Sequence, residues 1–144
     1  MGAVGEGDAA VRNERVVRMA GVAEQELAEA ERRQRAEVTR RAATFRAGRD
    51  PVPLDGRTAI IVDDGVATGA TMRAACAIAS ARRARRVVVA VPVADPDALG
   101  DLVDADEVVC LQAPAGFMAV GMHYVDFSQT RDDEVVRLLK RSGE

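Results

Sequence analysis

Long apolar runs are missing from this 144-residue sequence, and residues 1–10 lack the apolar core of a signal peptide. Cysteine is scarce as well: Cys76 falls in an expected helix and Cys110 in an expected strand. Two such cysteines are typical of buried thiols in a reducing cytoplasm, and a disulfide or a metal pair is the less favoured alternative. We therefore expect a cytoplasmic protein without a membrane segment.

A net positive charge is also absent. The formal charge is −3 at pH 7, which gives no argument for nucleic acid as the main partner. The arginines of residues 32–41 are interleaved with or preceded by glutamates, namely Glu26, Glu29, Glu31 and Glu37. At helical spacing such residues form i,i+3 and i,i+4 ion pairs, so the run predicts a solvated helix face. The alternative, in which one arginine reaches a pyrophosphate, stays open.

The length and the order of elements predict a single α/β domain over residues 1–144. Residues 1–55 are the less regular, helical and loop part, with one long polar helix expected over residues 23–47 and ended by Gly48. Residues 56–144 alternate strands and helices, as in a parallel sheet. The expected strands cover residues 59–63, 86–93 and 107–111, and the expected helices cover residues 70–83, 95–102 and 132–141.

Residues 59–71, which read AIIVDDGVATGAT, combine a strand, two acids and a loop. Residues 60–62 are continuous and β-branched, as in a parallel strand that is covered on both faces. Asp63 and Asp64 follow at the carboxyl end of this strand. In open α/β sheets, ligands bind at that edge, so both carboxylates are candidate site residues.

The loop after the two acids consists mostly of small residues and includes two threonines. Its members are Gly65, Val66, Ala67, Thr68, Gly69, Ala70 and Thr71. Small side chains let the backbone approach a ligand closely, and a helix is expected to begin near Ala70. Loop amides and a helix N-terminus together form an anion site, so this loop predicts a bound phosphate.

The carboxylates of Asp63 and Asp64 would repel that phosphate, and they suit a vicinal diol instead. Each hydroxyl of a diol can donate a hydrogen bond to a carboxylate oxygen. A phosphate in the loop and a diol beside the acids together describe a ribose 5-phosphate. A dinucleotide-binding loop is disfavoured because its glycine spacing is missing, and a P-loop is disfavoured because no Gly-Lys-Ser/Thr occurs.

The string from the apolar strand through Asp63-Asp64 to Thr71 resembles the motif that binds 5-phosphoribosyl 1-pyrophosphate (PRPP) in the type I phosphoribosyltransferases. The resemblance implies a Rossmann-like parallel sheet, with the long polar helix placed before the motif strand. It also implies an enzyme that transfers phosphoribosyl from PRPP to a base nitrogen and releases pyrophosphate. Mg²⁺ would accompany PRPP, held mainly by substrate oxygens and water without a dedicated metal cluster.

Two positions depart from the family pattern. Many members carry a bulky aliphatic residue where this chain has Gly65, and threonine or aspartate where it has Ala67. The members that salvage 6-oxopurines usually place an acid at the Ala67 position, as a proton-transfer group near the base. A methyl group cannot transfer a proton, so purine salvage of that type is disfavoured.

Residues 114–135 resemble the C-terminal end of bacterial phosphoribosyltransferases of unassigned base specificity, which share the motif strand, the VVVAVPVA strand and a DFSQ segment. In better-known relatives an aromatic residue of this region stacks on the base, and an acid approaches the pyrophosphate and metal end. Phe117 and Asp126 are the matching positions here. The alternative is that the aromatics only close an edge of the sheet. His123, the only histidine, is expected to be exposed or loosely packed rather than a catalytic base.

The same resemblance indicates an N-terminally truncated domain. A complete family member has an earlier βα unit whose loop binds pyrophosphate, and residues 1–7 match a point downstream of that unit. The chain would then be a fragment, an inactive remnant, or a PRPP- or nucleotide-binding regulatory module that does not turn over. Loss of that unit would leave an edge or a face of the sheet open, which predicts a homodimer or aggregation.

Overall fold

The computed structural model describes residues 2–6, 10–12, 14–46 and 48–141. Its centre is a parallel sheet of three strands in the order β3-β4-β5. These strands are β3 (Thr58–Val62), β4 (Arg86–Val93) and β5 (Glu107–Gln112), each within one residue of its expected bounds. The α/β parallel sheet predicted from the sequence is therefore confirmed.

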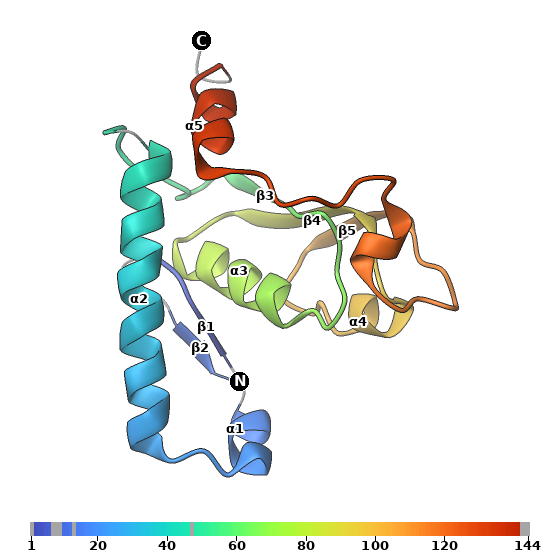
Figure 1. Cartoon of the computed structure of the whole chain (residues 1–144), viewed down its shortest axis with the longest axis horizontal. Helices are drawn as coiled ribbons and strands as arrows, with labels where there is room; N and C mark the ends of the chain where they lie inside the picture. The colour runs from blue at the N-terminus through green and yellow to red at the C-terminus, as the bar shows by residue number, and fades with distance from the viewer. Residues whose placement is uncertain (1, 7–9, 13, 47, 142–144) are drawn as a thin grey trace.

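Two helices lie on one face of this sheet (Figure 1): α3 (Ala70–Ala81) and α4 (Pro96–Gly100). Asp95 is the N-cap of α4 as expected, and its carboxylate accepts the amide N–H of Asp97 at 2.8 Å. The helix ends at Gly100, two residues before the expected end. Alternate residues of β4 point toward these helices and are buried: Val87, Val89, Val91 and Val93. Val87, Val89 and Val91 form the core together with residues of α3, namely Met72, Cys76 and Ala79.

The opposite face of the sheet is exposed, and this corrects the expectation of a strand that is covered on both faces. Ile60 and Val62 of β3 are 65% and 73% exposed, and Leu111 of β5 is 77% exposed. The register pairs Val62 with Ala90 and Ala90 with Val109, so these side chains share one face. A continuous apolar run predicts a strand of a parallel sheet, but it does not show which faces other elements cover.

The N-terminal part forms a short antiparallel hairpin and two helices. Strands β1 (Gly2–Val4) and β2 (Ala10–Arg12) pair with each other, and α1 (Glu14–Ala20) follows. Helix α2 (Glu24–Arg46) runs beside the α/β part and has no buried residue (Figure 1). The helix was expected to end at residue 47, which lies outside the described residues. Residues 1 and 7 of the expected N-terminal segment also lie outside them.

Ion pairs line helix α2, as the alternation of glutamate and arginine predicts. Glu31 pairs with Arg35 at 2.8 Å, and Glu37 pairs with both Arg40 and Arg41 at 2.8 Å. These pairs confirm the solvated-face interpretation of the arginine run. None of the helices in the described part of the chain is long and apolar enough to cross a membrane.

The C-terminal part leaves the carboxyl end of β5, forms a 3₁₀ turn and returns over the sheet toward α2 (Figure 1). The turn, η1 (Val120–His123), was not predicted from the sequence. The closing helix α5 (Asp132–Arg141) has the predicted bounds and packs beside α2. Because β3, β4 and β5 are parallel, the loop after β3 and the residues after β5 meet at the same edge of the sheet.

Candidate functional site

The loop between β3 and α3 is anchored to the neighbouring strand at its middle. The amide of Val66 donates to the carbonyl of Val93 at 3.0 Å, and the amide of Asp95 donates to the carbonyl of Val66 at 2.8 Å. The Val66 side chain is buried in the core. Val66 is therefore the structural anchor of the loop, and the residues on either side of it are free to face a ligand.

The two loop glycines are required for different reasons. Gly69 has φ of +69°, a left-handed conformation that disfavours other residues, and it precedes the first turn of α3. Gly65 lacks space for a side chain. A Cβ atom there would lie 2.7 Å from a methyl carbon of Val120 and 2.9 Å from the carbonyl oxygen of Val93. The departure at Gly65 from the bulkier family pattern is thus explained by the close passage of Val120.

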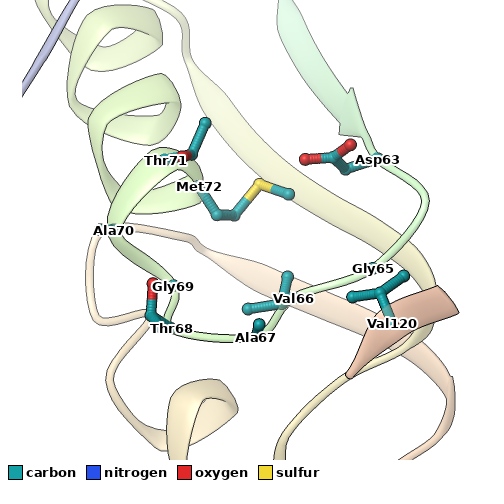
Figure 2. Close-up of a pocket in the computed structure, with 10 residues that line it drawn as sticks. All are labelled: Asp63, Gly65, Val66, Ala67, Thr68, Gly69, Ala70, Thr71, Met72 and Val120. Atoms are coloured by element: carbon teal, nitrogen blue, oxygen red, sulfur yellow. The ribbon is translucent and has the colours of Figure 1, made fainter. Parts of the chain in front are cut away.

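The loop lines a small, open cavity of about 210 Å³ (Figure 2). Its lining comprises Asp63, Gly65, Val66, Ala67, Thr68, Gly69, Ala70, Thr71, Met72 and Val120. Pockets for drug-sized ligands measure roughly 300–1,000 Å³, so this one suits a smaller group such as a phosphate with part of a sugar. The structure thus brings together Asp63 and every residue of the predicted loop.

The electrostatics of the cavity divide it into two sides. On one side, α3 begins at Ala70, and the first amide N–H groups of a helix have no acceptor within the helix. On the other side, the Asp63 carboxylate projects from the end of β3 toward α3 (Figure 2). One oxygen of that carboxylate accepts the amide N–H of Asp64 at 3.0 Å. The arrangement can hold an anion at the helix and hydroxyl donors at the acid.

Asp64 does not line the cavity in the structure, although its side chain is exposed beside it. Its backbone carbonyl accepts a hydrogen bond from the hydroxyl of Tyr124 at 2.7 Å. Reasoning from the sequence missed both Tyr124 and the cavity residue Val120. Val120 lies 55 positions after Gly65, and Tyr124 lies 60 positions after Asp64. The cluster of aromatics in residues 117–127 is the only signal that could have drawn attention to them.

Phe117 and Asp126 lie outside the lining of the cavity. Phe117 is half-buried and stacks on His123, with ring centroids 5.6 Å apart and an angle of 9° between the rings. The exposed Asp126 carboxylate accepts the amide N–H of Ser128 at 2.8 Å. Hydrogen bonds from Ser128 lower the pKa of Asp126 below its usual range, so this carboxylate is ionised at neutral pH. The roles that the resemblance implies for these two residues stay predictions.

Neither cysteine takes part in the cavity. Cys76 is fully buried in α3, and burial raises the pKa of its thiol above the usual range, so the thiol is protonated and unreactive. Cys110 is half-buried and directs its thiol to the carbonyl of Gln112 at 3.1 Å. Among the described residues, no three His, Cys, Asp or Glu side chains are grouped to hold a metal ion.

Several known proteins resemble this chain in sequence, and one solved structure resembles it in fold as well. Two strains of Mycobacterium tuberculosis encode proteins named “Putative phosphoribosyl transferase” that are 51% identical to it over 142 residues, or 98% of this chain. The crystal structure of TT1426 from Thermus thermophilus matches with a TM-score of 0.79 and 43% identity over 97% of this chain. The chain spans 32% of the mycobacterial relatives and 66% of TT1426.

The family model of the phosphoribosyl transferase domain matches residues 13–124. This range contains β3, the cavity loop, α3 and the rest of the sheet. It also contains Val120 and Tyr124, the two residues that contact the loop from the C-terminal side. By this match, and by its α/β fold, the chain belongs to the type I phosphoribosyltransferase family.

Proposed function

We propose that this chain provides the PRPP-binding part of a phosphoribosyltransferase, which transfers phosphoribosyl to a base nitrogen and releases pyrophosphate. The observation that carries the proposal is the cavity between the end of β3 and the start of α3, which places the loop and the first turn of α3 opposite the Asp63 carboxylate. Family membership supports phosphoribosyl transfer in general. The choice of PRPP rests on the match between this cavity and a ribose 5-phosphate.

Each side of the cavity has a distinct role in this proposal. The amide of Val66 already donates to Val93, so the amides after this anchor, those of residues 67–71 at the N-terminus of α3, bind the 5-phosphate. The binding energy of the phosphate then orients the reacting carbon of the ribose. Asp63 and Asp64 accept hydrogen bonds from the ribose hydroxyls. The anchor of Val66 on β4 keeps the two sides at a fixed separation, so the loop is pre-organised for the sugar phosphate.

Mg²⁺ fits this site as an ion carried by the substrate. Among the described residues that line it, the cavity offers a single ionisable side chain, Asp63. Mg²⁺ bound by proteins usually keeps several waters and substrate phosphate oxygens. When bound, the ion neutralises charge on the pyrophosphate leaving group. In this proposal the chain itself holds the phosphoribosyl end at the loop.

A second candidate function is PRPP sensing without turnover. It is favoured by the described lining of the cavity, in which Asp63 is the only ionisable residue, while the Ala67 position carries a methyl group. A coupled assay for pyrophosphate distinguishes the two functions. Release of pyrophosphate from PRPP in the presence of a base supports transfer, and binding without release supports sensing.

The decisive experiment compares two ligands in isothermal titration calorimetry. The double variant Asp63→Asn with Asp64→Asn should bind ribose 5-phosphate at least about tenfold more weakly, because hydrogen bonds to charged groups contribute about 1.5–3 kcal/mol each. Inorganic phosphate contacts only the loop, so its affinity should stay the same or rise. The double variant of Asp97→Asn on α4 with Asp101→Asn directly after α4 is the control, since it makes the same change in charge outside the cavity. Equal weakening of both ligands would contradict the roles assigned to the acids.

A further inference from the structure

Residues 120–127, here called the strap, contact the cavity loop at two neighbouring positions. The hydroxyl of Tyr124 donates to the carbonyl of Asp64 at 2.7 Å. Val120 lies against Gly65, where a Cβ atom would be 2.7 Å from a methyl carbon of the valine (Figure 2). The strap thus contacts the loop between its acids and its anchor at Val66.

The strap is itself held in shape by Phe127. The Phe127 ring packs against Tyr124, with centroids 5.2 Å apart and a 41° angle between the rings. It also covers Gly121 so closely that a Cβ atom there would lie 2.8 Å from the ring. The amide of Tyr124 donates to the carbonyl of Gly121 at 3.3 Å. These contacts restrict the Tyr124 ring, so its hydroxyl is presented to Asp64 in a defined position.

The loop needs an external contact at this point. Glycine has more conformational freedom than any other residue, so the peptide between Asp64 and Gly65 is free to rotate unless something fixes it. Val66 is fixed by β4 on the far side of Gly65. On the near side, the hydrogen bond from Tyr124 to the Asp64 carbonyl fixes the same peptide.

We propose that Tyr124 is a positioning residue for the ribose: through the Asp64 carbonyl, it orients the Asp63 and Asp64 carboxylates toward the two sugar hydroxyls. This inference rests on the proposed function of the cavity. It assigns no contact between Tyr124 and the substrate. Its specific consequence is that Tyr124 affects the sugar side of the site and leaves the phosphate side, which is anchored by Val66 and α3, unchanged.

The test is Tyr124→Phe, which removes only the hydroxyl and keeps the ring that packs on Phe127. A neutral hydrogen bond contributes about 0.5–1.5 kcal/mol, so the affinity for ribose 5-phosphate should fall about threefold to tenfold. The affinity for inorganic phosphate should stay within about twofold. Thr44→Val is the matched control, because the Thr44 hydroxyl also donates to a backbone carbonyl, that of Arg40 at 3.0 Å, on α2 and outside the cavity.

A second variant and a second readout keep the proposal testable if Tyr124→Phe folds poorly. Phe127→Leu retains the hydroxyl but loosens the ring, and it should produce a smaller loss for the same ligand. The amide nitrogen shift of Gly65 in NMR spectra should change in both variants. Equal loss for ribose 5-phosphate and phosphate, or no loss for either, would overturn the positioning role. If the unmodified chain binds phosphate but shows no preference for ribose 5-phosphate, the proposed function itself fails, and this inference fails with it.

Discussion

Helix α2 and strand β4 are both long elements of the chain, but they are held in place by different interactions. In β4, Val87, Val89, Val91 and Val93 are buried beneath α3 and α4. Helix α2 has no buried residue, and charged side chains link it to its surroundings. Arg12 of the hairpin contacts both Glu24 and Glu31, at 2.9 and 2.8 Å.

The hairpin turn supplies a second link of the same kind. Glu6 pairs with Arg46 at the end of α2 and with Arg82 after α3. Burial raises the pKa of Glu6, but hydrogen bonds from Arg46 and Arg82 outweigh it, and the pKa lies below the usual range. The side chains of these ion pairs remain partly exposed to water, so the pairs contribute little to stability and are screened by salt. The buried valines of β4 contribute to stability at every salt concentration.

The difference places the candidate site on the stable part of the molecule. The cavity loop is bonded to β4 at Val66 and continues into α3, and both elements belong to the apolar core. Helix α2 makes none of these contacts with the loop, so the loop geometry is set by β4 and α3. A site that must hold a sugar phosphate in a fixed geometry is best built on such a rigid support.

The largest effect is expected from shortening a buried valine of β4. Val89→Ala removes two carbons from a fully buried side chain and leaves a cavity, so the free energy of unfolding should fall by about 2 kcal/mol. Val88→Ala is the matched control, because Val88 lies next in the same strand on the less covered face. Val88→Ala should lower the free energy of unfolding by less than about 1 kcal/mol. Urea unfolding measures both, and similar losses would show that the two faces of the sheet contribute equally.

Acid should loosen α2 before it unfolds the sheet. Hydrogen bonds from Arg40 and Arg41 lower the pKa of Glu37 to about 2, and the pKa of Glu31 is lowered by Arg12 and Arg35. A carboxylate whose pKa is lowered in the folded state stabilises that state at a pH above its ordinary pKa of 4.5. For Glu37 this stabilisation is lost as the pH falls from 4.5 toward 2. Hydrogen exchange, corrected for its intrinsic pH dependence, should show α2 losing protection in this window while β4 keeps it. Parallel loss in both elements would contradict the comparison.

Glu37→Gln provides the control for that experiment. It removes the titrating group but keeps a side chain of the same size on α2, so part of the pH dependence of α2 protection should disappear. Salt should mimic acid in the unmodified chain, since it screens the same pairs. Protection of β4 should respond to neither change, because the described core contains no buried charged residue.

Much of the sheet and of the cavity was predictable because the evidence is local. The strand, the acids and the loop of residues 59–71 are contiguous, and Asp95 followed by Pro96 marks the start of α4. Val120 and Tyr124 were not predictable as site residues, because their contacts with Gly65 and Asp64 join distant parts of the chain. Short-range patterns carry no information on which distant segment packs against a loop.

The sequence pattern also could not predict that one face of the sheet is exposed. Ile60, Ile61 and Val62 are alike in chemistry, yet Ile61 packs against the core while its two neighbours are exposed. A strand of a parallel sheet is apolar on both sides whichever elements cover it. Only the arrangement of α3 and α4, both on the same side, distinguishes the two faces (Figure 1).

That exposed face leads to the prediction with the smallest effect on stability. We expect the 144-residue chain to associate with itself through the apolar face that carries Ile60, Val62 and Leu111. The double variant Ile60→Thr with Val62→Thr should reduce light scattering across a concentration series, while changing the free energy of unfolding by about 0.5 kcal/mol or less. Ile61→Thr, on the covered face of the same strand, should instead destabilise the chain and leave self-association in place. If the unsubstituted chain is a monomer at every concentration, this face does not mediate association. The difference between the covered and the exposed face of the sheet would then affect only the stability of the chain.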